Sequence, residues 1–268
     1  MDKNILFAFG LTLIAGLSTG IGSAIAFFAK RTNTKFLAIS LGFSAGVMIY
    51  VSMIEIFAKA QDSLTAELGL KAGSWAAVAS FFGGMLLIAI IDKIIPSEEN
   101  PHHLHGVEEL NESKIQVEDN LMRTGIITAL AVGIHNFPEG LATFISALQE
   151  PSIAIPITVA IAIHNIPEGI SISAPIYYAT GDRKKAFKYS FLSGLAEPIG
   201  ALIGYLVLMP FLNDVVFGVV FGVVAGIMVY ISLDELLPSA QKYGEHHLSI
   251  AGLIAGMAVM AVSLLLFI

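Results

Sequence analysis

Apolar residues occur along the chain in eight long runs separated by short polar stretches. The runs cover residues 5–28, 36–58, 74–95, 124–147, 152–179, 186–210, 214–238 and 247–267. About 20 predominantly apolar residues are enough for a helix to cross the hydrocarbon layer of a bilayer. The pattern therefore predicts an all-α polytopic membrane protein with eight transmembrane helices, forming a single transmembrane domain over residues 1–268.

Composition strengthens the membrane assignment. Hydrophobic residues make up 56% of the chain, charged residues only 13%, and the mean hydropathy is +0.79. Soluble domains usually contain about 45–50% apolar and about 25% charged residues. The net charge is −7 and no basic cluster stands on a soluble domain, so nothing suggests a nucleic acid partner.

The Lys and Arg residues are distributed unevenly between the two sides of the predicted bundle. If the runs alternate in direction, eleven of these residues lie on one side and three on the other. Because Lys and Arg are enriched in cytoplasmic loops, this bias predicts a multi-pass protein of the cell membrane with both termini outside. The segment at about 96–123 is then a cytoplasmic loop. It is acidic and contains His102, His103 and His105, which either bind metal loosely or belong to a solvated loop.

Pairs of small residues spaced four apart recur in the apolar runs. Such pairs allow transmembrane helices to approach closely, and we expect them to serve packing within the bundle in preference to a dimer contact. The pairs are Gly16/Gly20, Gly42/Gly46, Gly200/Gly204, Gly218/Gly222/Gly226 and Gly252/Gly256.

Two segments of the sequence are repeated in runs of opposite direction. AVGIHNFPEG at 131–140 and AIAIHNIPEG at 160–169 agree at seven of ten positions. GVMIYVSMIEIFAKAQ at 46–61 and GIMVYISLDELLPSAQ at 226–241 agree at seven of sixteen. Repeats in antiparallel spans predict inverted-topology internal repeats, which in many secondary transporters meet around a binding site near the midplane of the membrane.

Polar side chains that bind metals gather in the middle of the fourth, fifth and sixth runs. Residues three and four apart lie on one helix face, so each HNxPE motif presents its His, Asn and Glu together. Buried carboxylates at this depth are costly and usually functional. The candidate ligands are His135, Asn136, Glu139, His164, Asn165, Glu168 and Glu197.

The composition of this cluster indicates which metals it would bind. Imidazole and carboxylate suit zinc, iron(II), manganese, cobalt or cadmium, and a chain without cysteine offers no thiolate for copper(I). We infer two adjacent positions that share Glu139 and Glu168 as bridging ligands. The first also uses His135 and His164, and the second, richer in oxygen, uses Asn136, Asn165 and Glu197. The alternative is a buried hydrogen-bonded network without metal.

Each motif also contains a proline, at Pro138, Pro167 and Pro198. Proline has no N–H and leaves the carbonyl four residues earlier unbonded. Irregular backbone of this kind is tolerated in a membrane where it lines a cavity.

Further acidic residues lie nearer the predicted ends of the spans. Acids at the mouths of a pathway concentrate cations. The candidates for metal access and release are Glu55, Glu235, Asp234 and Asp92, with Met48 as a soft transient ligand or, alternatively, a packing residue.

HNFPEG, HNIPEG and Ala196-Glu197-Pro198 resemble the motifs of the ZIP family of zinc/iron transporters, and most closely its bacterial ZupT-type branch. The resemblance extends over essentially the whole chain. It implies eight spans, a binuclear site at the candidate ligands, movement of metal toward the cytoplasm, homodimers and an elevator-like motion.

The sequence thus predicts a transporter that imports zinc, and also iron, manganese, cobalt or cadmium, as substrates, with no prosthetic cofactor. The alternative is an intramembrane zinc-dependent hydrolase, because His/Glu zinc sites also activate water. The chain contains no H-E-x-x-H motif, and a hydrolase has no use for ligands duplicated across an inverted repeat. A third alternative is a metal sensor, but a sensor does not need eight transmembrane spans.

Overall fold

The computed structural model describes residues 3–28, 34–94, 114–149, 151–211, 213–243 and 246–265. At some positions inside these ranges, His135 and Asp92 among them, the backbone is described and the side chain is not. Almost all of the described residues are helical, and no strand occurs among them. The predicted all-α class is confirmed.

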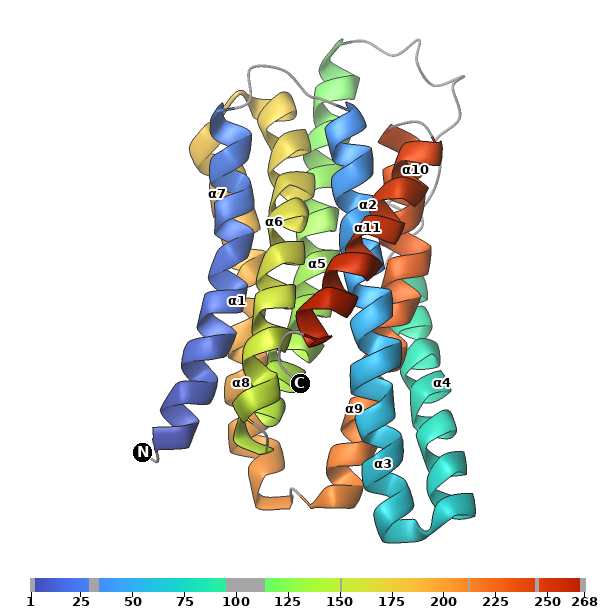
Figure 1. Cartoon of the computed structure of the whole chain (residues 1–268). Coiled ribbons are helices and arrows are strands. Elements are labelled where there is room, and N and C mark those ends of the chain that lie inside the picture. Colours follow the sequence, from blue (N-terminus) through green and yellow to red (C-terminus); the bar gives the residue numbers. More distant parts are fainter. Residues whose placement is uncertain are drawn as a thin grey trace.

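The helices run roughly along one common direction, up and down the long axis of the molecule (Figure 1). In chain order they are α1 (Lys3–Phe28), α2 (Thr34–Val51), η1 (Ser52–Ile56), α3 (Phe57–Leu68), α4 (Leu70–Ile94), α5 (Lys114–Gln149), α6 (Pro151–Thr180), α7 (Arg183–Gly194), α8 (Ala196–Ile203), η3 (Gly204–Leu208), η4 (Met209–Phe211), α9 (Asp214–Ile231), η5 (Ser232–Leu236), α10 (Leu237–Tyr243) and α11 (His246–Leu265).

Six stretches of the described helices are long and apolar enough to cross a membrane. They are Asn4–Ala24, Ala38–Leu68, Leu70–Ile91, Arg183–Val207, Asp214–Leu236 and His246–Leu265. Helix α6 adds a shorter apolar stretch, Ala154–Ile170. Helices α5 and α6 carry the polar HNxPE motifs in the middle. The chain is therefore a multi-pass helical membrane protein, and the count of eight spans remains a prediction.

The two largest differences from the predicted boundaries are helices that are longer than expected. The second apolar run ends at 58, but η1 and α3 continue the same helix to Leu68. Helix α5 begins at Lys114, so the last ten residues of the predicted 96–123 loop are helical. The rest of that loop, 96–113 with its three histidines, lies outside the described residues. An apolar run marks the part of a helix that faces lipid or the core, and the helix itself can extend beyond it.

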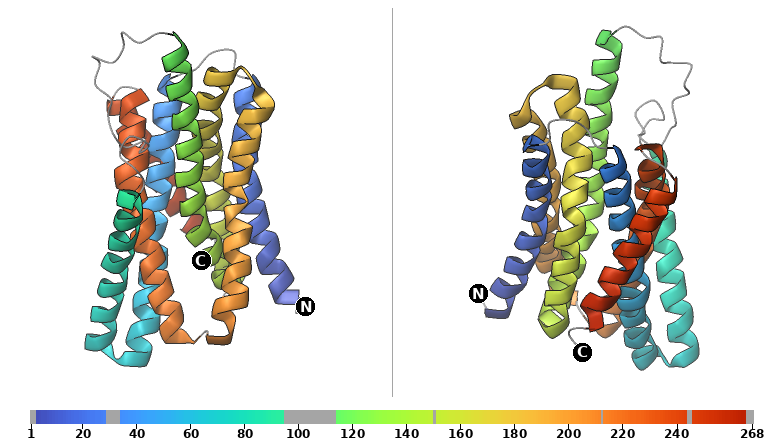
Figure 2. Two further views of the ribbon diagram at one scale, coloured as in Figure 1. Left: turned by 180° about the vertical axis from the view of Figure 1, so that it is seen from behind. Right: turned by 45° about the horizontal axis from the view of Figure 1, so that its top comes forward.

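The helices pack as two groups. In the first group, α1 packs on α6, and α5 packs on both α6 and α8. In the second group, α2 packs on α11, and α4 packs on α3 and α9. The groups meet where α2 contacts α6 and where α5 contacts α9. Figures 1 and 2 show the first group around α1, α6 and α7 and the second around α2, α9 and α11.

Glycine allows the backbones to touch within a group. A Cβ atom placed on Gly46 of α2 would lie 2.0 Å from the carbonyl oxygen of Leu253 on α11, and one on Gly256 of α11 would lie 2.1 Å from that of Phe43 on α2. Gly42 and Gly252 make equivalent approaches. These glycine pairs serve packing within the bundle, as predicted.

Helices α2 and α9 are each followed by a π-helical segment at matching positions of the longer repeat. A π-helical segment occupies Ser52–Ile56 in the first copy and Ser232–Leu236 in the second. Both serines are fully buried. After each π segment, Ala60 in one copy and Ala240 in the other are also fully buried. The two repeat copies therefore share an uncommon local structure as well as residues.

Candidate metal centre

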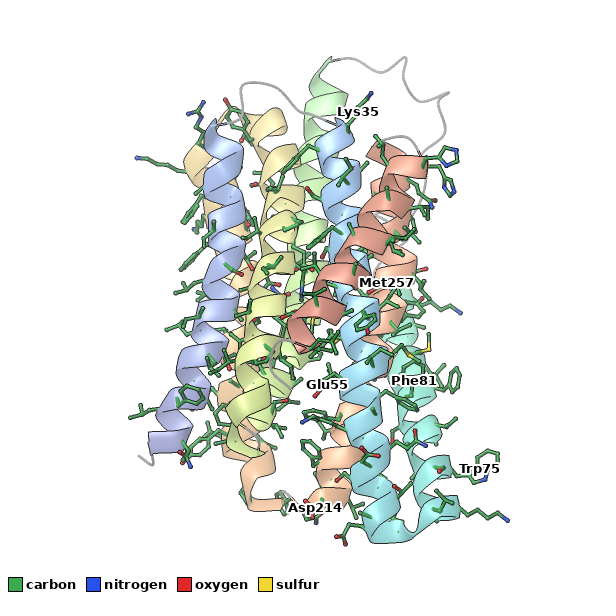
Figure 3. The ribbon with its side chains drawn as sticks, in the orientation of Figure 1. Lys35, Glu55, Trp75, Phe81, Asp214 and Met257 are labelled. Carbon is green, nitrogen blue, oxygen red and sulfur yellow. The ribbon has the colours of Figure 1, made fainter. Side chains whose placement is uncertain are left out.

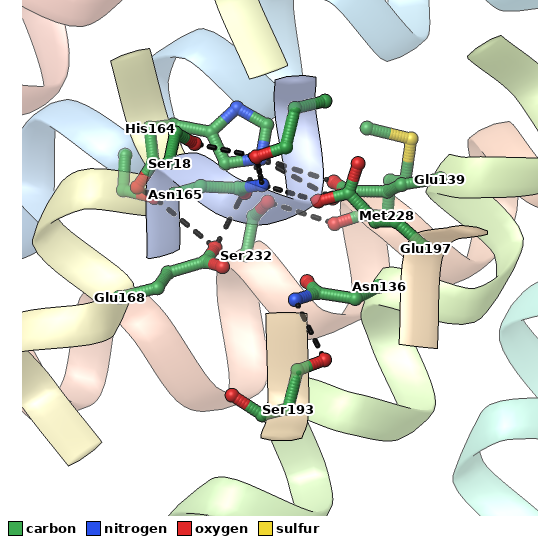
Figure 4. Close-up of polar contacts among 12 residues, drawn as sticks. Ser18, Asn136, Glu139, His164, Asn165, Glu168, Ser193, Glu197, Met228 and Ser232 are labelled. Carbon is green, nitrogen blue, oxygen red and sulfur yellow. Dashed lines mark hydrogen bonds and ion pairs between the residues drawn. The ribbon is translucent and has the colours of Figure 1, made fainter. Parts of the chain in front are cut away.

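Six of the seven predicted ligands have described side chains, and all six are fully buried. They are Asn136, Glu139, His164, Asn165, Glu168 and Glu197, each with 0% of its surface exposed. Helix α5 supplies the first two, α6 the next three, and Glu197 stands in the first turn of α8. The structure thus brings side chains from three helices of the first group into one polar cluster (Figure 4).

The residues around the ligands allow the three helices to approach closely. Helices α7 and α8 are separated by a break at Leu195, three residues before Pro198, because Pro198 cannot donate to the carbonyl of Gly194. A Cβ atom on Gly140, the last residue of HNFPEG, would lie 2.0 Å from the carbonyl oxygen of Glu197. Because Gly140 has no side chain, the backbone of α8 at Glu197 can lie directly against α5.

His164 connects the two repeat copies. Its Nε2 atom lies 3.2 Å from Oε1 and 3.3 Å from Oε2 of Glu139, across the α5–α6 contact. The same nitrogen lies 4.0 Å from Oε1 of Glu168, one turn along its own helix. One imidazole nitrogen thus faces carboxylates from both motifs (Figure 4). These are the three residues with described side chains in the first inferred metal position.

The amide and carboxylate oxygens of the second inferred position have few donors. Asn165 Nδ2 donates to Glu197 Oε1 and, at 3.0 Å, to the carbonyl oxygen of Ala15. Asn136 Nδ2 donates to the carbonyl oxygen of Ser193 at 3.3 Å. As a result, Oδ1 of Asn136, Oδ1 of Asn165 and Oε2 of Glu197 are buried and accept no hydrogen bond from any described residue.

Buried acceptors of this kind usually have a partner, because leaving them without one costs about 1–3 kcal/mol each. Three buried glutamates in one cluster also repel each other unless a cation or a proton lies among them. A divalent cation satisfies both requirements.

No three His, Cys, Asp or Glu side chains among those described stand in an arrangement that would hold one metal ion. The side chain of His135, the remaining predicted ligand, lies outside the described set, although its backbone is in α5. The described part of the cluster is thus a set of candidate ligands and not a complete coordination shell.

Sequence analysis missed one contributor, Ser44 on α2. Its Oγ atom lies 3.4 Å from Oε1 of Glu168 and 3.5 Å from the carbonyl oxygen of His164. Ser44 is fully buried and belongs to the second helix group, so it links that group to the cluster. A polar residue between Gly42 and Gly46 in an apolar run is the signal that could have identified it.

Of the residues predicted for access and release, Glu55, Asp234 and Glu235 lie away from the helix ends and Asp92 lies near one. Because the helix continues through α3, Glu55 lies well inside it, half-buried and 3.5 Å from Lys59 in an ion pair (Figure 3). Glu235 is buried and Asp234 half-buried in η5. Asp92 lies near the end of α4, and its side chain is outside the described set. Met48 is fully buried in the main hydrophobic cluster, where it packs as a core residue.

Comparisons with known proteins bear on the function of this cluster. The family model described as ZIP Zinc transporter matches residues 91–264. A zinc transporter ZupT of Clostridium perfringens is 66% identical, with 99% of this chain and 98% of that protein covered. Proteins of the same name from Lysinibacillus sphaericus and Streptococcus mutans are also 66% identical, each with full coverage of both chains.

The family and these relatives are described as transporters, so the comparisons favour the transporter hypothesis over the intramembrane hydrolase. The match includes both HNxPE motifs and Glu197. A family match over more than half of the residues, together with full-length relatives at 66% identity, establishes that the chain belongs to the ZIP zinc transporter family.

Proposed function

We propose that this protein imports zinc into the cytoplasm through a binuclear metal site near the midplane of the membrane, and that it also carries iron, manganese, cobalt or cadmium. The observation that carries the proposal is the set of buried oxygens on Asn136, Asn165 and Glu197 that accept no hydrogen bond from the described residues. They lie beside His164 and the two glutamates of the repeated motifs, and a divalent cation would satisfy them.

The two metal positions differ in ligand chemistry. The first would use His135, Glu139, His164 and Glu168, and the contact of His164 with Glu139 supports it. The second would use the oxygens of Asn136, Asn165 and Glu197 with the same two bridging glutamates. Bridging carboxylates are usual in sites with two metals about 3.5–4 Å apart.

Eight spans and an inverted repeat fit this site. Helices α5 and α6 have 36 and 30 residues and lie against the other helices of the first group. At about 1.5 Å per residue both are long enough to cross a bilayer. The matching π segments of α2–α3 and α9–α10 support the proposed symmetry.

The sidedness follows from the distribution of positive charge. Lys35 lies at one end of the molecule, and Trp75 and Asp214 lie at the other (Figure 3). The exposed Arg183, Lys184 and Lys185 begin α7 at the end where Lys35 lies (Figure 1). We assign that end to the cytoplasm, with both termini of the chain outside.

Acidic residues then lie along the proposed route on either side of the centre. Glu55 and Glu235 occupy matching repeat positions in η1 and η5. We propose that they, with Asp234 and Asp92, attract cations toward the site. The homodimer and the elevator-like motion implied by the resemblance remain predictions.

Uptake of radiolabelled zinc by proteoliposomes that contain the purified protein tests the proposal. We expect uptake by the unaltered protein and none by Glu168→Ala, with Glu67→Ala, an exposed glutamate on α3, as the matched control. Parallel measurements with and without a pH gradient or a membrane potential identify the driving force. Equal uptake by protein-free liposomes and by all three proteins would refute metal transport by this chain.

A further inference from the structure

An apolar groove runs between the two helix groups. Its volume is about 910 Å³, and its walls are formed by α4 and α9 on one side and by α5, α7 and α8 on the other. In the left view of Figure 2, α9 and α7–α8 stand on either side of α5. Almost all of the lining is aliphatic or aromatic, and several lining side chains are half exposed, among them Leu130, Leu192 and Ile199.

The position of the groove limits what fills it. Its walls belong largely to apolar stretches that cross the membrane, such as Leu70–Ile91 and Asp214–Leu236. Water has almost no polar partner there, and the surroundings at this depth are the acyl chains of lipids. The volume falls within the about 300–1,000 Å³ that small-molecule sites usually have. An acyl chain therefore suits the groove better than water or a polar solute.

Positive charge lies directly above one end of the groove. Lys185 and Lys188 on α7 are exposed. Each precedes a lining residue, Tyr189 or Leu192, by four positions, so each lies one turn above it on the same helix face. Neither lysine forms an ion pair with a carboxylate that the structure describes. Basic residues above a cleft between transmembrane helices on the cytoplasmic side are suited to anionic lipid head groups.

We propose that this groove and the two lysines bind an anionic phospholipid of the cytoplasmic leaflet. One acyl chain lies in the groove, and the phosphate of the head group lies between Lys185 and Lys188. The acyl chain alone gives little selectivity, because lipid tails are as apolar as the groove. The lysines supply the preference for an anionic lipid.

The groove borders the cluster of candidate ligands, and none of those ligands lines it. Phe137 and Pro138, the two residues before Glu139, line the groove. A lipid held there touches the helix segment that carries Glu139, from the side of Phe137 and Pro138. Which lipid occupies the groove can therefore affect the helix that carries Glu139 through direct contact.

Quenching of tryptophan fluorescence by brominated lipids tests the proposal independently of transport. Trp75 is the single tryptophan of the chain, so the Trp75→Phe variant has no tryptophan fluorescence of its own. Leu130→Trp then places a reporter in the groove. Leu86→Trp is the matched control, because Leu86 is 62% exposed, adjoins the lining residue Leu87 and does not itself line the groove.

Each variant is reconstituted in phosphatidylcholine vesicles with a fixed fraction of phosphatidylglycerol, and bromine is carried by one lipid or the other. We expect brominated phosphatidylglycerol to quench the reporter at position 130 more strongly than an equal fraction of brominated phosphatidylcholine. At position 86 the two lipids should quench equally. Removal of one lysine by Lys185→Gln or Lys188→Gln should reduce the preference roughly five-fold, from about 1 kcal/mol per lysine. Lys71→Gln, at the opposite end of the molecule, should leave it unchanged.

Equal lipid discrimination at positions 130 and 86, or a preference that survives loss of both lysines, would overturn the proposal. Absence of quenching at position 130 by either lipid would do the same and would indicate that protein covers the groove. If Leu130→Trp does not fold, Leu192→Trp reports from the opposite wall. None of these outcomes depends on zinc transport, so failure here leaves the proposed function standing.

Discussion

Glu197→Gln removes one negative charge from the buried cluster and hardly changes its volume. Glu197 Oε1 accepts a hydrogen bond from Asn165, and Oε2 has no donor among the described residues. Glu139 and Glu168 are also fully buried. Loss of one of three buried carboxylates reduces their mutual repulsion and the cost of keeping charge away from water. We therefore expect the metal-free variant to be more stable than the unaltered protein.

In the presence of zinc the same change acts in the opposite direction. We expect loss of this charged ligand to reduce the free energy of zinc binding by about 2 kcal/mol, within the range for hydrogen bonds to charged groups. This corresponds to a roughly 30-fold weaker zinc affinity. Zinc at about 100 times the dissociation constant of the unaltered protein stabilises that protein by about 2.7 kcal/mol. At the same zinc concentration the variant gains only about 0.9 kcal/mol.

Thermal unfolding of the purified proteins in detergent, with a chelator and with zinc, measures both effects. Glu67→Gln is the matched control, because Glu67 is an exposed glutamate on α3 and its loss should change neither quantity. The two predicted changes have opposite signs, so a general loss of stability cannot imitate them. A variant that keeps the full zinc-induced shift would refute the assignment of Glu197 to the site.

Three further predictions test other parts of the interpretation. Glu139→Ala should abolish zinc uptake into proteoliposomes, because it removes a carboxylate that faces His164 and bridges both proposed positions; normal uptake by a correctly inserted variant would contradict this. His164→Asp should weaken zinc uptake more than manganese uptake, because zinc favours the lost nitrogen; an unchanged zinc-to-manganese ratio in competitive uptake would show that the two positions do not differ chemically. The chain has no cysteine, so single cysteines can be introduced at positions 213 and 183, which lie at opposite ends of the molecule. The cysteine at 213 should react with an impermeant thiol reagent added outside, and the cysteine at 183 should not. The reverse labelling would overturn the proposed orientation.

The grouping of the candidate ligands was predictable because their relative positions depend mainly on local spacing. Residues three and four apart on a helix share a face whatever the tertiary structure, and duplication of the HNxPE motif indicated that the two faces meet. Ser44 could not be found in this way. Its position in the longer repeat corresponds to Val224, so no duplication marked it. Its contact with Glu168 depends on how α2 crosses α6, which belongs to the packing of the two helix groups.

Helix ends were less predictable than helix positions, as α3 illustrates. Lys59, Asp62 and Glu67 interrupt the apolar pattern, so the sequence indicated an end near residue 58. The helix continues because Ala60 and Leu64 pack against α9, where Gly218 allows close approach. It ends at Gly69, whose φ of 77° is readily adopted by glycine.

The π segments determine which side of the following helix faces the protein. A π-bulge corresponds to one extra residue within a helix, and one residue turns a helix by about 100°. Shortening Ser52–Ile56 by one residue would leave the hydropathy of the span almost unchanged, yet it would rotate α3 so that Ala60 faced away from α9. The same holds for η5 and Ala240, which is buried in α10, the helix that packs against α2. In this protein a one-residue deletion at either segment is thus a large change in shape, although a hydropathy profile would barely register it.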